Sequence, residues 1–300
     1  MSFTVDVGFV TQFSDLVIHL AQQEESVLRG TVRTKPVTGK SFNAERLGAV
    51  EMVQQATRHS PTPIVNPDHT RRRGYMLDYS AAVLLDEEDE IKLLISPQSE
   101  YARSLAMARN RRFDNTVIAS FAANATSVSA ADVETSTSNL TSFVGAGGLT
   151  ANHTIANGST GLTLAKVRQV KRLLDLQEVP ESGRHFLTSA YGMEDLLADA
   201  QLTSADFNSL RAMESGTINN RFWMGFTWHF SNLMAITSNI QPNYAWHESA
   251  IQVGEGSLRE LAIDKRADLN NSLQVLAKMS IGAVRVEESK VVMADIDVTA

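Results

Sequence analysis

The side chains best suited to catalysis or metal binding in this chain are seven histidines, at positions 19, 59, 69, 153, 185, 229 and 247. No two of them stand four residues apart, the spacing that places two imidazoles on one helix face for a metal ion. The pair His247-Glu248 lacks the second histidine of a zinc-protease helix. The chain has no cysteine, which excludes thiolate catalysis and cysteine-ligated metals. We therefore expect no catalytic, metal or cofactor site.

Two short runs have the composition of ligand-binding loops, but they lack the flanking elements or the residue spacing that such loops require. The run Gly145-Ala146-Gly147-Gly148 has neither a preceding strand nor a following helix, and no Walker lysine follows it, so it predicts a flexible connection. The acidic run Asp86–Glu90 lacks the alternating spacing and the glycine of a calcium loop. A solvated turn is the better interpretation of that run.

Three adjacent bases, Arg71, Arg72 and Arg73, form the densest basic run in the sequence. Such a run can bind phosphate, a membrane surface or the carboxylates of a neighbouring molecule. The chain has 27 Lys and Arg against 34 Asp and Glu, a net charge of −7, so a general affinity for phosphate backbones is not expected. We therefore favour carboxylates as the partner of these arginines.

The overall composition is that of a folded protein. The chain has 300 residues, of which 43% are hydrophobic, enough for a core and too apolar for a disordered polymer. It shows neither a basic signal-peptide start nor 18 consecutive apolar residues, so we expect a cytosolic chain with no membrane partner. Trp223, Trp228 and Trp246 suit either a stacking platform for bases or sugars or a core, and their apolar surroundings favour the core.

The N-terminal third predicts elements that need a partner surface. Residues 9–29 carry Phe13, Leu16 and Leu20 at helical steps, which predicts an amphipathic helix whose apolar face must dock elsewhere, with another subunit as one candidate. Residues 31–95 read as polar extended segments around a tip with three prolines at 61–67, which predicts a long two-stranded arm. The alternative is an irregular surface excursion packed on its own domain.

The rest of the chain mixes helices and strands. Ser96 and Pro97 begin a helix that runs to about residue 123 and carries a winding apolar stripe and a basic, partly exposed face. Residues 124–161 predict a long connection or a mobile insertion. Beyond them we expect a helix at 163–176, strands at 186–188, 222–230 and 233–237, short helices near 195–197 and 204–212, and a C-terminal hairpin over 280–298 that packs on the long helix. This order favours an α+β fold over a doubly wound sheet.

The order of these parts resembles the major capsid protein of tailed bacteriophages, the Hong Kong 97 fold. Local strings that are similar include Phe13 to Gln23, Ser96 to Tyr101, Arg111 to Asp114 and Gly282 to Arg285. The resemblance implies five parts along the chain. They are an N-terminal arm (1–30), an extended E-loop whose strands lead into the peripheral domain (31–95), a spine helix with a flexible connection (96–161), an axial domain (162–265), and a peripheral-domain return with a C-terminal hairpin (266–300).

The resemblance also implies a structural function with no catalysed reaction. Copies of the chain would form pentamers and hexamers of an icosahedral shell in the virion, assembled in the host cytoplasm around double-stranded DNA that the acidic subunits do not grip. No charged coiled coil precedes residue 9, so we expect a separate scaffolding protein, or a chain already processed, and a portal. A covalent Lys–Asn crosslink cannot be carried over. The alternatives are an encapsulin-like cellular compartment with protein cargo and, more remotely, an α+β enzyme.

The candidate contacts between subunits are Phe13, Leu16 and Leu20 in the arm, and Arg71, Arg72 and Arg73 in the E-loop. We predict that Arg71→Glu combined with Arg73→Glu blocks assembly and leaves the subunit folded, because the two charge reversals repel the neighbour's carboxylates. Light scattering measures assembly and circular dichroism measures folding. Normal assembly of the double variant would contradict the prediction.

Overall fold

The computed structural model describes residues 22–55, 57–58, 61–85, 98–123, 126–128, 153–198, 222–256, 261–269 and 271–299. The chain divides into two compact units. The small unit comprises Met1–Glu25, Tyr79–Asn110 and Leu258–Met279, and the large unit comprises Ser26–Asp78, Arg111–Ser257 and Ser280–Ala300. Helix α2 (Gln98–Ala122) and strand β13 (Ser272–Arg285) contribute residues to both.

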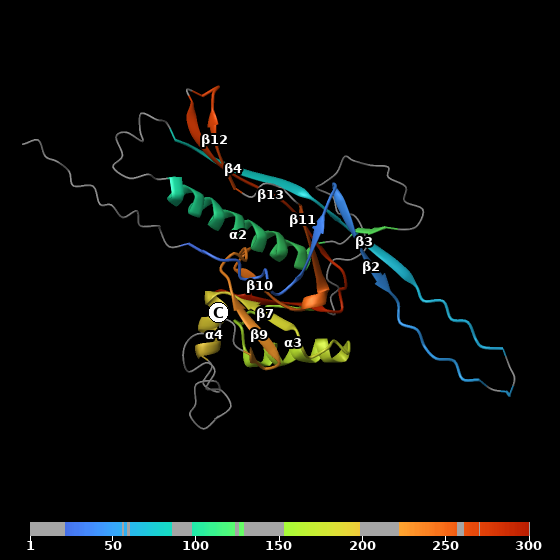
Figure 1. Ribbon diagram of the computed structural model, residues 1–300. Helices are drawn as coiled ribbons and strands as arrows, with labels where there is room; N and C mark the ends of the chain where they lie inside the picture. The colour runs from blue at the N-terminus through green and yellow to red at the C-terminus, as the bar shows by residue number, and fades with distance from the viewer. Residues whose placement is uncertain are drawn as a thin grey trace, which may run out of the picture. The chain divides into compact units, whose positions relative to one another are not determined.

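A six-stranded sheet lies at the centre of the large unit. Its order is β6 (Thr154–Ile155), β14 (Val291–Asp297), β10 (Ile240–His247), β7 (Arg184–Thr188), β9 (Phe226–Phe230) and β8 (Phe222–Trp223). Helices α3 (Leu164–Leu176) and α4 (Ala190–Ala198) pack on one face of it. The C-terminal part of α2 packs on the other face, where the Phe121 ring stacks on Tyr244 at a centroid distance of 4.9 Å (Figure 1).

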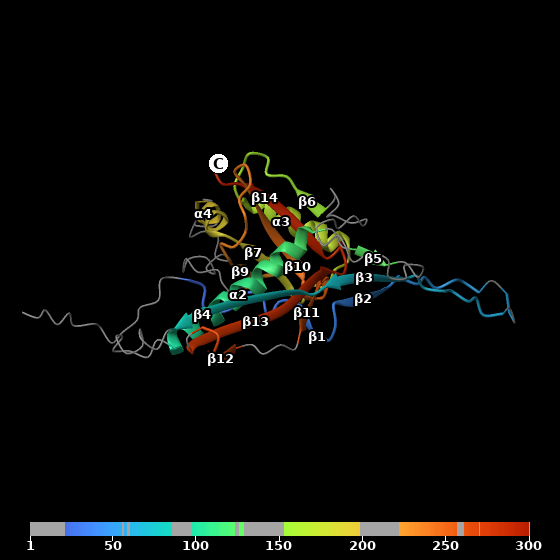
Figure 2. The same ribbon diagram turned by 90° about the horizontal axis from the view of Figure 1, so that it is seen from above.

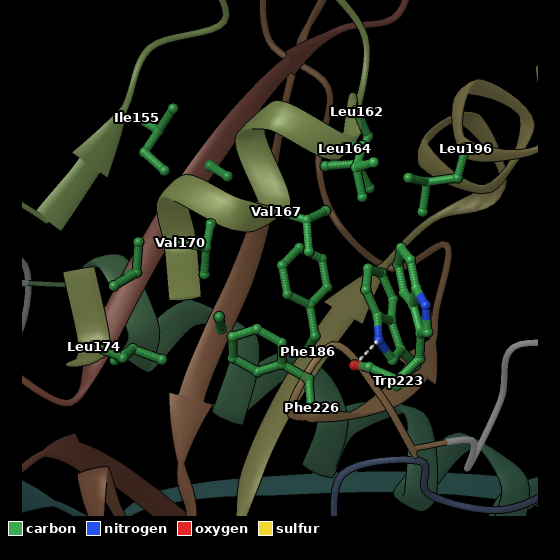
Figure 3. Packing of buried hydrophobic residues seen from close by; sticks show 14 of the residues in the cluster. Ile155, Leu162, Leu164, Val167, Val170, Leu174, Phe186, Leu196, Trp223 and Phe226 are labelled. Atoms are coloured by element: carbon green, nitrogen blue, oxygen red, sulfur yellow. Dashed lines mark hydrogen bonds between the residues drawn. The ribbon is translucent and has the colours of Figure 1, made fainter. Parts of the chain in front are cut away.

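The main core fills the space between this sheet and helix α3 (Figure 3). Val167, Val170 and Leu174 on one side of the helix are fully buried, because apolar residues recur at three- and four-residue steps. Trp228 is also fully buried and its indole N–H donates to the Trp223 carbonyl at 3.1 Å. The prediction that the tryptophans pack in the core is therefore confirmed.

The predicted helix at 163–176 is confirmed as α3, and its start is defined by two side chains. Thr163 is the N-cap, and its hydroxyl accepts from the Lys166 backbone N–H at 3.4 Å. The buried Lys166 ammonium donates to the carbonyls of Asn157, Thr160 and Asp295 at 2.7, 2.8 and 3.0 Å. Burial lowers the pKa of Lys166, while nearby carboxylates oppose that shift. These three bonds attach the helix to β14 and to the preceding loop.

Two further sheets are built from the remaining strands. One has the order β2 (Ser41–Leu47), β3 (His69–Tyr75) and β5 (Thr126–Val128). The other has the order β1 (Arg33–Val37), β11 (Ile251–Gly256), β13 and β12 (Leu261–Arg266), with β4 (Leu77–Leu85) also paired to β13. In the small unit, Leu105 of α2 packs against Val275 and Ala277 of β13. This contact joins β13 to the long helix, at residues that precede the segment 280–298 for which such packing is expected.

The predicted C-terminal hairpin is wrong, although both of its strands exist. β13 pairs with β11, whereas β14 pairs with β10 in a different sheet. The chain crosses between the sheets at 286–290, next to the short 3-10 helix Glu248–Ala250, which joins β10 to β11. Backbone N–H groups of His247 and Val286 bond across this double corner to Lys290 and Ala250, at 3.1 and 2.8 Å. Alternating side chains identify a strand, but they do not identify its neighbour.

The predicted N-terminal helix does not extend to residue 29, because residues 22–29 form bends and turns. Asp114 of α2 is fully buried and explains this conformation. Its carboxylate accepts from the Ser26 hydroxyl and from the N–H groups of Val27 and Leu28 at 2.5, 2.9 and 3.2 Å. These groups bind the carboxylate in place of helical carbonyls. Residues 9–21 lie outside the described part of the chain.

Other local expectations have mixed outcomes. The helix expected from 96 to 123 is confirmed as α2, and the short helix expected near 195–197 is confirmed as α4. The strand expected at 186–188 is β7, and the strand expected at 222–230 is present as β8 and β9. The predicted strand at 233–237 is wrong: this segment is irregular and leads into a tight turn at Ser238 and Asn239, which have φ of 51° and 64°. Residues 124–161 are predicted to form a long connection or a mobile insertion, and the structure shows that short strands β5 and β6 lie within them and extend two sheets. Four predictions concern residues outside the described part of the chain: the cap at 96–97, the acidic run at 86–90, the glycine run at 145–148 and the helix at 204–212.

Two histidines that are far apart in the sequence meet in the six-stranded sheet. His185 Nδ1 lies 3.0 Å from His229 Nε2, so at least one ring is neutral and accepts. Both rings lie beside Trp246, at centroid distances of 5.5 and 6.2 Å. Burial lowers the pKa of each histidine from 6.5 to about 4.

This pair predicts an acid-dependent loss of stability. The folded-state pKa lies below the unfolded value, so the unfolded chain binds more protons as pH falls from 6.5 toward 4, and the free energy of unfolding decreases across that range. Denaturant unfolding at pH 7.5 and pH 5 measures the loss. We expect a smaller loss in the His185→Gln/His229→Gln variant, and no such reduction for His69→Gln, whose side chain is exposed. Equal losses in wild type and the double variant would contradict the assignment.

Candidate functional site

The most distinctive feature of the large unit is an arm formed by residues 41–75. Strands β2 and β3 pair antiparallel from Ser41 opposite Tyr75 to Leu47 opposite His69. Beyond the last backbone bond, from the Gly48 N–H to the Asp68 carbonyl at 2.7 Å, the described residues form no strand or helix. We call residues 48–68 the arm tip, and Figure 2 shows it continuing past the ends of both strands. A two-stranded arm with a proline-containing tip is thus confirmed for residues 41–75. The predicted range of 31–95 is too long, because β1 pairs with β11 and β4 pairs with β13 in another sheet.

The arm tip and its base expose large apolar side chains. Met52 and Ile64 have relative exposures of 101% and 88%, and those of Leu47, Val50 and Val53 are 63%, 50% and 58%. Scattered exposed apolar residues are normal, but a concentration on one projecting segment marks an interaction surface. In the described structure nothing in the same chain covers these side chains.

The root of the arm is seated by one aromatic ring and two glycines. Phe42 of β2 is 6% exposed and packs with Val37 and Val284. A Cβ on Gly254 of β11 would lie 2.7 Å from this ring, and a Cβ on Gly74 of β3 would overlap it. Both positions therefore require glycine for the ring to fit between the strands. The root is held by shape as well as by hydrogen bonds.

A buried group of charges also holds the arm root. Arg72 of β3 is 6% exposed, pairs with the Glu288 carboxylate, and donates to the Arg285 carbonyl at 3.0 Å. The Arg285 guanidinium, 1% exposed, donates to the Phe121 carbonyl of α2. Burial lowers the pKa of Arg285, Glu288 opposes that shift, and Arg72 adds to it. The single carboxylate of Glu288 thus lies beside two buried cations.

The structure separates the three candidate arginines by strand alternation. Arg72 points inward and binds within its own chain, whereas Arg71 is exposed and pairs across the arm with Glu45 at 2.6 Å. Arg73 Nε lies 3.5 Å from the Asn43 side-chain oxygen. Contacts of these arginines with another subunit stay a prediction. The other candidates, Phe13, Leu16 and Leu20, lie outside the described residues.

Sequence reasoning missed the residues that seat the arm. Gly74, Gly254 and Gly282 each interrupt a strand pattern, which is a signal of close backbone approach. A Cβ on Gly282 would overlap the Tyr75 carbonyl, so this strand position requires a residue without a side chain. Glu288 had no distinguishing signal, because a carboxylate in a predicted turn normally faces solvent.

Within the described residues no helix is both long and apolar enough to cross a membrane. No group of three or more His, Cys, Asp or Glu side chains in that part of the chain is placed to hold a metal ion. The arm, with its exposed apolar tip, is the principal candidate for function.

Several solved structures from phages share this architecture. A structure from Mycobacterium phage Che8 is 19% identical, covers 94% of this chain and 95% of its own, and has a TM-score of 0.68. The capsid of cyanophage P-SCSP1u is 15% identical, covers 95% and 92%, and has a TM-score of 0.73. The mature capsid of bacteriophage PhiM1 is 12% identical, covers 95% and 91%, and has a TM-score of 0.67. The expected α+β fold of tailed-phage capsid proteins is confirmed.

The family follows from the sequence itself. The model of the phage capsid protein family matches residues 5–298. The chain belongs to this family and is a structural protein of the phage capsid. None of the curated proteins compared with it matches.

Adding a methyl group in the space occupied by the Phe42 ring should destabilise the packing at the arm root. We predict that Gly254→Ala lowers the free energy of unfolding by about 1–3 kcal/mol, because the added methyl group meets the Phe42 ring and Val37. Denaturant unfolding of unassembled subunits measures the change. The matched control is Gly30→Ala, where nothing lies within 4 Å of the added carbon. A Gly254→Ala variant as stable as the control would contradict the proposed seat.

Proposed function

We propose that this chain is the major shell-building subunit, and that its arm tip packs against a neighbouring copy. The observation that carries this proposal is the exposed apolar surface of the tip on a firmly seated root. Burying Met52 and Ile64 against another subunit would stabilise the contact by about 1.5–3 kcal/mol per side chain. Repeated around a ring and over a shell, such contacts bind each copy to the next.

The proposal includes the larger assembly. Copies form pentamers and hexamers that close into an icosahedral shell around double-stranded DNA, in the virion and, during assembly, in the host cytoplasm. A separate scaffolding protein and a portal complete the particle, and the subunit catalyses no reaction. Membership of the phage capsid family supports this assignment over an encapsulin-like compartment. Nucleic acid in purified particles supports the phage shell, and protein cargo without nucleic acid would contradict it.

The apolar tip can be tested without disturbing the folded body. We predict that Met52→Asp with Ile64→Asp abolishes shell formation and leaves the unfolding temperature unchanged, because two carboxylates cannot be buried in an apolar contact. Light scattering and electron micrographs of the same sample measure assembly, and shells are megadalton particles. The matched control is Gln54→Asp with Thr62→Asp, which adds the same charge at exposed polar positions of the same tip. Normal shells from the Met52/Ile64 variant would overturn the arm contact.

A further inference from the structure

An open basic hollow lies on helix α3, away from the arm. Its volume is about 500 Å³, and its lining residues are Arg168, Lys171, Arg172, Asp175, Leu176 and Met224. The last of these lies in the turn between β8 and β9. All six residues belong to the large unit.

Helix geometry puts the three cations on one side of α3. Arg168 and Arg172 are four residues apart, so they share a face with a rise of about 6 Å between them, and Lys171 lies beside them. The opposite face buries Val167, Val170 and Leu174 in the main core. The basic face is therefore held outward by the same packing that fixes the helix.

Within the described part of the chain, no acidic side chain neutralises the two arginines of the hollow. Lys171 Nζ lies 3.4 Å from Asp175 and 3.9 Å from Glu181, and Asp175 is also bound to Arg184 at 2.6 Å. For Arg168 and Arg172, which are exposed, the described residues supply no hydrogen bond or ion pair. Their mutual repulsion is relieved when an anion binds. Such a site is unusual in a chain of net charge −7.

The shape and chemistry of the hollow favour phosphate groups with apolar neighbours. Guanidinium groups bind phosphate oxygens in a two-pronged geometry. Leu176, which is 68% exposed, and Met224 provide apolar surface beside the cations. A nucleic-acid backbone presents this combination, because each phosphate is flanked by sugars.

We propose that this hollow binds the phosphate backbone of double-stranded DNA, and that α3 therefore faces the packaged genome. This inference rests on the proposed function and names a contact point on a subunit whose net charge otherwise repels DNA. The two unpaired arginines predict weak binding with a salt slope, log K against log [salt], of about −1.8, or about a 12-fold loss of affinity between 50 and 200 mM salt. Contact is thus local, reversible and independent of base sequence.

The direct test is DNA binding by unassembled full-length subunits. Fluorescence anisotropy with a 20-base-pair duplex, at a series of salt concentrations, gives the affinity and its salt slope. We expect Arg168→Gln with Arg172→Gln to weaken binding and to reduce the magnitude of the slope by about 2. The matched control is Arg103→Gln with Arg266→Gln, which removes the same charge from guanidinium groups already paired with Glu24 and Asp268. Equal slopes in wild type and the Arg168/Arg172 variant would overturn the proposal.

A second version of the assay distinguishes DNA from an acidic protein as the ligand of the hollow. A polyglutamate peptide of matched charge replaces the duplex in the same assay. Weaker binding of the peptide than of DNA supports the proposal, whereas tighter binding that depends on Arg168 and Arg172 would overturn it in favour of a protein partner. Shell formation is measured separately. Wild-type shells without DNA binding at α3 would overturn this inference alone, and failure of the wild type to form any shell even with its scaffolding protein would overturn the proposed function.

Discussion

Placement of the Phe42 ring between two bare strands is the constraint on which the arm depends. A projecting pair of strands has little core of its own and is marginal in water when isolated. Here the ring packs at the root, and the glycines at 74 and 254 allow strands β3 and β11 to approach it closely. The root therefore has the packing of a protein interior, while the tip stays open. An apolar tip is useful for contact with another molecule only if its base directs it reproducibly.

Buried ion pairs and hydrogen bonds further fix the orientation of the arm root. Arg72 and Arg285 are both almost fully buried, and Glu288 lies beside both of them. An unpaired buried charge is costly, so removal of Glu288 would affect both arginines at once. These contacts link β3, the corner between β13 and β14, and the C-terminal part of α2. Charged side chains in one buried cluster thus bind the arm to the strands and to the helix of the large unit.

Sequence reasoning succeeded where local patterns determine structure. Helices α2 and α3 follow from apolar spacing, and the two strands of the arm follow from polar extended sequence on either side of three prolines. It failed where a distant group decides the conformation. Asp114 holds residues 26–28 in turns, and the pairing of β13 with β11 separates two strands that a short turn would join. Burial of Arg72 likewise depends on Glu288, which lies 216 positions further along the chain.

The arm divides its residues into two groups with different freedom to vary during evolution. Much of the described tip has exposed side chains and no regular backbone pairing, so its length and composition can drift to follow the surface that it meets. Phe42 and the glycines at 74 and 254 have no such freedom, because a larger residue at either glycine requires a smaller ring. Relatives should therefore differ most at the tip, and positions 42, 74 and 254 should change only together.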